Sequence, residues 1–250
     1  MRTPRLILAL AAIASCLTAS ASFARTSCPS HFVEGTAPSL PPKLTPRTRE
    51  LCYASFALLH SALSRTALWS AERLTRKSVS AAEALERSSE FFPEPRLPKT
   101  ERSELSDFKY SGFDRGHLAP SGNMPTQRAQ QQSFTLANII AQHANLNRRA
   151  WRSIESDIRD AATTYGSAYV ITGPLFIGSR IQSLHGRVLI PTHVWKAVYI
   201  PHQGAVVYVA TNAAKPQIRK ISVSQFAKSY GINPFPALTG SVRSQLLNLS

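Results

Sequence analysis

Apolar and polar residues alternate along the chain in patterns that predict a mixture of helices and strands. The clearest helix is expected at residues 147–165, where apolar side chains recur at helical spacing and Gly166 suits the position after the last turn. A shorter helix is expected at residues 222–230, where Gly231 follows, and another at 81–87. Helices therefore account for only part of the pattern.

Strands are predicted where Val, Ile and Tyr are concentrated in the second half of the chain. These segments are residues 168–172, 187–190, 194–200 and 205–210. Residues 51–75 are ambiguous, because their apolar positions fit either a helix or two strands, 53–60 and 67–75, around a turn. The mixture predicts an α+β fold with a largely antiparallel central sheet flanked by helices.

Prolines divide the rest of the chain. Residues 25–50 contain five prolines, which exclude a long helix and predict an extended N-terminal arm. Residues 91–106 are expected to be a loop, and the glycine-rich residues 107–124 a structured loop with short strands. A chain of 250 residues then leaves residues 51–250 as a single domain of ordinary size.

The N-terminus has the pattern of an export signal. Arg2 and Arg5 precede an apolar run at residues 6–14, which is too short to span a bilayer, and small residues lead to Ala24. Residues 1–24 are therefore expected to direct export to the periplasm or medium and to be removed. The alternative is a lipoprotein anchored through Cys16. No later stretch has the length and apolarity of a transmembrane segment.

Three cysteines are present, and export changes what they imply. Cys16 leaves with the signal if cleavage follows Ala24, so Cys28 and Cys52 remain as an even pair in an oxidising compartment. We predict a disulfide between them that ties the arm to the domain. Two free thiols are the alternative.

The charge is strongly positive. The chain has 29 Lys and Arg against 14 Asp and Glu, a net charge of +15, which becomes +13 when Arg2 and Arg5 leave with the signal. Such an excess indicates an anionic partner, either nucleic acid or an anionic membrane surface. A solvated basic surface without a specific partner is the alternative.

Residues 114–117 concentrate chemistry in four positions. Asp114, Arg115 and His117 supply an acid, a guanidinium and an imidazole, and Gly116 is expected to allow an unusual backbone conformation. Phosphodiester hydrolysis needs a base for the attacking water and positive charge on the phosphoryl oxygens. His117 suits the first task and Arg115 the second. A lone histidine in a loop, however, is more often structural.

A second group of polar residues begins the predicted long helix. The amide oxygen of Asn147 is a neutral, hard ligand that suits Mg²⁺. Glu155 lies eight residues later, roughly 12 Å along a helix, so it is expected to reach the same ion only through water. The alternative is an ordinary polar face on which Asn147 caps the helix.

In this order, the segments 114–117 and 146–151 followed by Glu155 resemble the DNA/RNA non-specific endonuclease family, the ββα-metal nucleases that include endonuclease G. Further segments that match the family pattern are 68–75, 111–113, 171–175, 190–191 and 195–196. The resemblance extends over about residues 50–235 and favours the strand pair at 53–75. Two departures are Ala141, where the family usually has proline, and Arg149, where a small or neutral residue is usual.

The resemblance implies a role for each candidate residue. His117 corresponds to the general base, Asn147 to the direct ligand of the metal, and Glu155 to a catalytic residue that holds the metal through water. Asp114 corresponds to a catalytic-motif residue that supports the loop. Asn138 corresponds to a residue that orients the metal-bound water and the neighbouring loop.

Three residues are expected to bind substrate: Arg115, Asn138 and an upstream arginine on the scissile phosphate, for which Arg87 is the candidate. The implied cofactor is Mg²⁺, with Mn²⁺ or another divalent cation as a substitute. The implied activity is cleavage of DNA, RNA or both into products with 5′-phosphates. The alternatives are an exported basic nucleic-acid-binding protein without catalysis and a phosphodiesterase for another anionic substrate. No sequence feature predicts an oligomeric state or a protein inhibitor.

Overall fold

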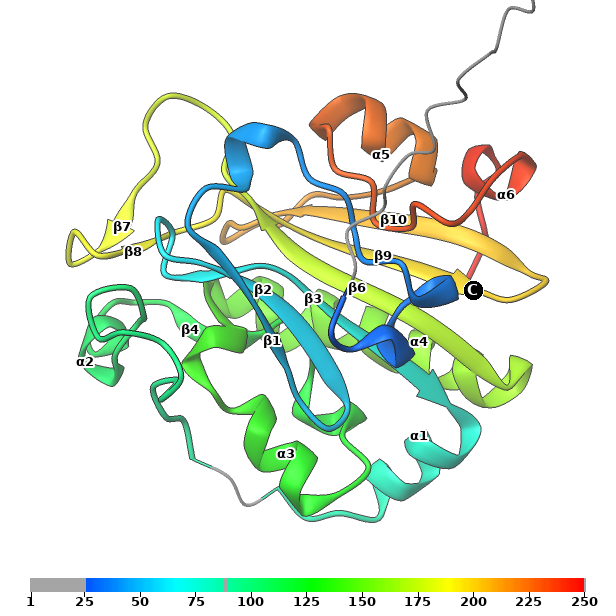
Figure 1. Cartoon of the computed structure of the whole chain (residues 1–250), viewed down its shortest axis with the longest axis horizontal. Helices are drawn as coiled ribbons and strands as arrows, with labels where there is room; N and C mark the ends of the chain where they lie inside the picture. The colour runs from blue at the N-terminus through cyan, green and yellow to red at the C-terminus, as the bar shows by residue number, and fades with distance from the viewer. Residues whose placement is uncertain (1–25, 88–89, 250) are drawn as a thin grey trace, which may run out of the picture.

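A computed structural model describes residues 26–87 and 90–249 of the chain (Figure 1). The predicted export signal, residues 1–24 with Cys16, lies outside the described residues. An antiparallel sheet of seven strands in this part of the chain runs in the order β1-β2-β3-β6-β9-β10-β11. Its strands are β1 Thr48–Cys52, β2 Phe56–Ser61, β3 Thr66–Thr75, β6 Ser167–Leu175, β9 His193–Ile200, β10 Gly204–Thr211 and β11 Ile218–Ile221.

Helices and two small ribbons surround this sheet. The helices are α1 Arg76–Glu83, α2 Leu105–Phe108, α3 Gln127–Ser133, α4 Arg152–Tyr165, α5 Val223–Tyr230 and α6 Ser241–Ser244. The ribbons are β4 Asp114–His117 with β5 Ile139–Gln142, and β7 Ser183–Leu184 with β8 Val188–Leu189. Short 3₁₀ turns are η1 Pro29–His31, η2 Val33–Gly35, η3 Pro42–Leu44, η4 Ser121–Asn123 and η5 Leu136–Asn138, and η6 Leu146–Trp151 is a π-helical turn. The α+β architecture with a largely antiparallel sheet is thus confirmed.

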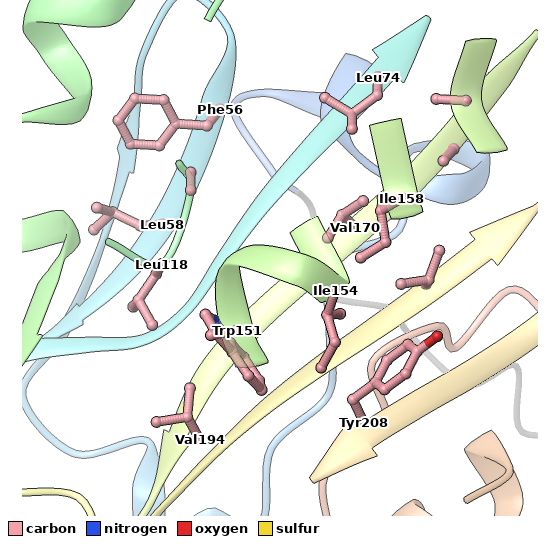
Figure 2. Close-up of a cluster of buried hydrophobic side chains, with 14 of the residues drawn as sticks. Phe56, Leu58, Leu74, Leu118, Trp151, Ile154, Ile158, Val170, Val194 and Tyr208 are labelled. Carbon is pink, nitrogen blue, oxygen red and sulfur yellow. The ribbon is translucent and has the colours of Figure 1, made fainter. Parts of the chain in front are cut away.

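Both faces of the sheet are buried, which explains why its central strands are apolar almost without interruption. Along β10, Val206 and Tyr208 face one hydrophobic cluster, whereas Val207 and Val209 face the other. The first cluster lies between the sheet and α4 and includes Trp151, Ile154 and Ile158 (Figure 2). The second lies between the sheet and two other segments, the N-terminal arm and α5. It includes Phe32, Trp69, Trp195 and Phe226. Helix α4 is therefore fixed against the centre of the sheet.

Several predicted elements occur where the pattern placed them. Residues 53–75 form the strand pair β2 and β3, and the helix reading of this segment is excluded. The predicted helix at 222–230 is α5, with Ser222 as its N-cap and Gly231 in the left-handed conformation after it. The predicted helix at 147–165 is present as η6 and α4, and Gly166 follows with a φ of 94°.

Other expectations were wrong in position or incomplete. The helix expected at 81–87 is α1, which begins at Arg76, because Thr75 caps it directly after β3 through a reciprocal hydrogen bond with Ser78. The arm at 25–50 is not uniformly extended: it contains η1 to η3, and its last residues already pair within β1. The elements α3, β5 and β11 were not predicted, since all three are short and two of them are polar.

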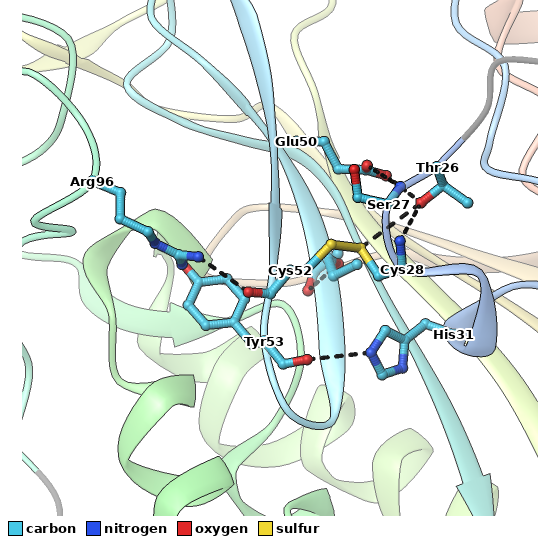
Figure 3. The surroundings of a disulfide bond; sticks show 10 residues. Thr26, Ser27, Cys28, His31, Glu50, Cys52, Tyr53 and Arg96 are labelled. Atoms are coloured by element: carbon cyan, nitrogen blue, oxygen red, sulfur yellow. Dashed lines mark hydrogen bonds between the residues drawn. A yellow bond between two sulfur atoms is a disulfide. The ribbon is translucent and has the colours of Figure 1, made fainter.

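The predicted disulfide between Cys28 and Cys52 is present and joins the arm to β1 (Figure 3). Glu50 of β1 reinforces this junction, since its carboxylate accepts hydrogen bonds from the Thr26 hydroxyl and the Ser27 amide. In addition, Phe32 packs edge-on against Trp69 with ring centroids 5.5 Å apart. The arm is thus part of the folded core.

Across residues 26–87 and 90–249, no helix combines the length and the apolar character of a membrane span.

Candidate active site

The 114–117 motif lies on β4, which forms a two-stranded antiparallel ribbon with β5. Asp114 pairs with Gln142 and His117 with Ile139. In a strand, successive side chains point to opposite sides, so Arg115 and His117 share a side of the ribbon. The ribbon leads through a short connection into η6 and α4, which together give the order strand, strand, helix.

Position 116 has room only for glycine. Gly116 was expected to adopt an unusual backbone conformation, but it is not among the glycines with positive φ, and that expectation was wrong. A Cβ atom at this position would lie 2.1 Å from Gln142 Oε1 and 2.6 Å from Gln142 Cβ. The buried Gln142 side chain therefore occupies the volume that any larger residue at position 116 would need.

A cleft of about 670 Å³ brings most of the predicted site residues together. They come from four separate segments: the region after α1, strand β4, turn η6 and helix α4. The predicted site residues that line the cleft are Arg87, Arg115, His117, Asn147 and Glu155. Residues 68 positions apart in sequence thus contribute to one surface.

His117 lies against aromatic rings. The centroids of Phe134 and Phe91 lie 4.9 Å and 5.5 Å from the imidazole, and Nε2 is buried without a hydrogen-bond partner among the described residues. Burial, aided by the positive charge of Arg87, lowers the pKa of His117 from 6.5 to about 3. The imidazole is therefore neutral at physiological pH, the state in which it accepts a proton.

Asn147 is held by the motif itself. Its amide Nδ2 donates to Asp114 Oδ2 at 2.9 Å. Asp114 in turn accepts two hydrogen bonds from Arg148, from Nε at 2.8 Å and from Nη2 at 2.6 Å. These bonds lower the pKa of Asp114, with Arg148 as the main cause. Asp114, which was expected to support the loop, thus connects β4 to the start of the helix.

Glu155 lies one turn into α4, above a buried lysine of the sheet. Its carboxylate is 3.6 Å from Lys196 Nζ, and Lys196 donates to Thr172 Oγ1 at 2.7 Å. The lysine side chain is only 1% exposed and lies 5.4 Å from the ring of Trp151. Burial raises the pKa of Glu155, while Lys196 and Arg159 oppose that rise. Lys196 thus holds the Glu155 carboxylate from the side of the sheet, and Glu155 lines the cleft.

Two of the five arginines that line the cleft lie against aromatic rings. The Arg115 guanidinium lies 5.1 Å from the ring of Phe91, and the Arg87 guanidinium lies 5.2 Å from the ring of Phe134. Neither forms a salt bridge among the described residues. Both cations are therefore free to meet an anionic group in the cleft.

Asn138 requires a correction, because the structure does not place it where a substrate reaches. Its side chain is 0% exposed and does not line the cleft. The amide accepts from the Ala119 nitrogen at 3.0 Å and donates to the carbonyls of Ala119 and Ser133, both at 2.9 Å. With these three bonds, Asn138 fixes the segment that follows His117, as expected for a loop-supporting residue, and has no direct contact with the cleft.

Sequence reasoning missed three residues of this site: Arg148, Arg159 and Lys196. Arg148 and Arg159 line the cleft, and Arg159 donates to Asn123 Oδ1 at 3.3 Å. Arg159 is one helical turn beyond Glu155, a spacing that was visible in the sequence. Lys196 carried a signal too, since a lysine inside an apolar strand requires a buried partner.

A candidate metal site was sought from the donor atoms. Within the described residues, the one compact group of His, Cys, Asp and Glu ligands is Cys28, Glu50 and Cys52, and its two sulfurs form the disulfide. The cleft instead offers an amide oxygen from Asn147 and a carboxylate from Glu155, which are the hard oxygen donors that Mg²⁺ or Mn²⁺ prefers.

The fold and this cleft define a ββα-metal nuclease architecture, and comparison with known proteins agrees. The family model for DNA/RNA non-specific endonuclease matches residues 36–237, and the chain belongs to this family. One chain of a crystal structure of the EndoG/EndoGI complex, which describes the mechanism of EndoG inhibition, superposes with a TM-score of 0.70 at 26% identity. The match covers 76% of this chain and 86% of that one.

Curated relatives are similar over the central part of the chain. Nuclease C1 of Cunninghamella echinulata var. echinulata is 35% identical over 159 residues, which are 59% of this chain and 63% of the relative. Mitochondrial endonuclease G of Caenorhabditis elegans is 36% identical over 157 residues, 58% of this chain and 51% of the relative. The chain thus spans between half and two thirds of the length of these relatives.

Proposed function

We propose that this protein is an exported, metal-dependent endonuclease that hydrolyses phosphodiester bonds of DNA, RNA or both with little sequence preference. The main support is that one cleft contains a neutral histidine, two oxygen donors, and the arginines Arg87 and Arg115, which form no salt bridge among the described residues. Family membership supports the same activity. The positive net charge of the chain supports an anionic, polymeric substrate.

The residues present fit a divalent cation. Asn147 is the proposed direct ligand, because Asp114 occupies its amide nitrogen and leaves the amide oxygen without a hydrogen-bond partner among the described residues. Glu155 is the proposed water-mediated ligand, since it lies eight residues after Asn147, in α4, and lines the same cleft. When bound, Mg²⁺ or Mn²⁺ would neutralise charge on the scissile phosphate and on the leaving oxygen.

His117 is the proposed general base. Its buried, unpartnered Nε2 takes a proton from a water molecule that attacks phosphorus in line with the leaving 3′ oxygen. The new bond joins the water oxygen to phosphorus, and the bond between phosphorus and the 3′ oxygen breaks. The products therefore carry a 5′-phosphate and a 3′-hydroxyl. Arg115, with Arg87 on the same cleft, stabilises the negative charge of the transition state.

Export is proposed from the N-terminal pattern and from the cysteines. The disulfide between Cys28 and Cys52 is of the kind that persists in oxidising compartments. The protein would therefore act in the periplasm or outside the cell, and lipid attachment at Cys16 is the competing mode of export.

Incubation of the purified protein with plasmid DNA, RNA and a small generic phosphodiester, each with Mg²⁺ or with EDTA, tests the proposal. We expect cleavage of a polynucleotide with Mg²⁺ or Mn²⁺, no cleavage in EDTA, and products with 5′-phosphates. Cleavage that is indifferent to EDTA contradicts the metal site. Binding without cleavage would identify a nucleic-acid-binding protein, and hydrolysis of the small ester alone would identify a different phosphodiesterase.

A further inference from the structure

Arg148 lies at the surface, yet it forms a bidentate ion pair with Asp114 of the 114–117 motif. Its side chain is 70% exposed, yet two of its guanidinium nitrogens are directed at the two oxygens of Asp114. Bidentate pairs of this kind fix the plane of a carboxylate as well as its position. Asp114 itself is only 16% exposed, so Arg148 covers it from the solvent side.

The orientation of Asp114 decides the orientation of Asn147. An ionised carboxylate only accepts hydrogen bonds, so it selects the NH₂ end of a neighbouring amide. Asp114 Oδ2 receives Asn147 Nδ2 at 2.9 Å, and the Asn147 oxygen is therefore turned away from Asp114. A rotation of this amide by 180° would place two acceptors against each other. The carboxylate thus determines which atom of Asn147 is available as a ligand.

Arg149 shows that a cation at this end of the helix does not need such contacts. It is exposed, as Arg148 is, and it forms no hydrogen bond or salt bridge among the described residues. Arg148 lines the cleft, whereas Arg149 does not. Two adjacent, exposed arginines with equal charge therefore differ in that Arg148 lines the cleft and is linked through Asp114 to Asn147.

We infer that Arg148 is a positioning residue for the metal ligand, which acts by clamping Asp114 so that Asp114 holds the Asn147 oxygen toward the cation. This inference rests on the proposed metal site at Asn147. It predicts that Arg148 affects the affinity for the divalent cation before any nucleic acid is present. A residue that only contacts substrate phosphate would not have that effect.

The experiment measures Mn²⁺ binding to the nucleic-acid-free protein by electron paramagnetic resonance, for the wild type, Arg148→Gln and Arg149→Gln. Removing a group that orients a metal ligand typically weakens metal binding by about 10-fold or more. We therefore expect about 10-fold weaker Mn²⁺ binding by Arg148→Gln and unchanged binding by Arg149→Gln. The control removes the same charge from the neighbouring exposed position.

Two further variants exclude trivial explanations. Arg148→Lys keeps the charge but lacks the planar fork, so it should also weaken Mn²⁺ binding, and it provides the answer if Arg148→Gln does not fold. In the background of Asp114→Asn, adding Arg148→Gln should cause no further loss of Mn²⁺ affinity, because the path through Asp114 is already broken.

Some results would overturn the inference. Wild-type Mn²⁺ affinity in Arg148→Gln, combined with weaker DNA binding, would identify Arg148 as a phosphate contact. Equal weakening in both arginine variants would indicate a general charge effect. Failure of the proposed function is distinguishable, since the wild type would then bind no Mn²⁺ at this site, and Asn147→Ala would leave its metal binding unchanged.

Discussion

At the scale of single residues, burial determines the protonation state of His117. The imidazole lies against the rings of Phe91 and Phe134, where burial disfavours its protonated form. The positive charge of Arg87 acts in the same direction. A histidine in water is partly protonated just below neutral pH, whereas this one stays neutral. The proposed general base therefore stays neutral when the solution is mildly acidified.

This state of His117 leads to a prediction for the metal-free protein. Its pKa of about 3 lies below the ordinary value of 6.5, so the unfolded chain binds one more proton than the native protein between these values. Stability should therefore fall as the pH drops through this window. NMR titration should show a neutral His117 imidazole at pH 5, and His117→Ala should lose less stability than the wild type between pH 7 and pH 4. A midpoint near 6.5 would contradict the proposed environment.

Sequence patterns identified the chemistry of the site better than its geometry. Asp114, His117, Asn147 and Glu155 were found because their order and spacing resemble those of the DNA/RNA non-specific endonuclease family. The burial of Asn138 was not predictable, because it depends on the path of the backbone at Ala119 and Ser133. Contacts with residues far away in the chain, such as that of Gly116 with Gln142, likewise leave no local signal.

At the scale of elements, periodicity predicted strands and helices that have a long apolar pattern. Strands β9 and β10 and helix α4 belong to this class. Short elements such as β5 and α3 have too few turns or alternations to stand out, and their conformation is set by pairing and packing. Close packing also explains Gly173 of β6, where a Cβ would lie 2.4 Å from the Leu68 carbonyl oxygen.

The disulfide between the arm and β1 gives a prediction at this scale. It closes a loop with a sequence separation of 24 residues, for which loss of loop-closure entropy in the unfolded chain corresponds to roughly 3 kcal/mol. Cys28→Ser combined with Cys52→Ser should lower the free energy of unfolding by about that amount. Urea denaturation with and without reductant measures it. The reductant should affect the wild type and leave the double variant unchanged, and an insensitive wild type would contradict the prediction.

At the scale of the whole molecule, the sheet is a rigid support between two clusters of side chains. Helix α4 is fixed to one face (Figures 1 and 2). Turn η6 brings Asn147 to the cleft, and the first turn of α4 brings Glu155 to it. The buried Lys196 connects this helix to β6 and β9 beneath Glu155. The net charge of the chain is +15, and an excess of this size favours association with an anionic polymer, as the proposed function requires.

The fold class and the family followed from the sequence because the motifs cover most of the domain. The cleft did not, since it is formed by segments that are far apart in the sequence, from the region after α1 to helix α4. The order of the motifs indicated the candidate site residues. In the structure, most of them line one cleft, whereas Asn138 does not.

Plasmid cleavage by His117→Ala in Mg²⁺ tests whether His117 is the general base. It is compared with cleavage by the wild type and by His193→Ala, a histidine that does not line the cleft. We predict that His117→Ala loses at least about 100-fold in the rate of cleavage while it retains its fold and its Mn²⁺ binding, because only the general base is removed. His193→Ala should cleave like the wild type. A folded, metal-binding His117→Ala protein with near wild-type activity would show that His117 is not the general base.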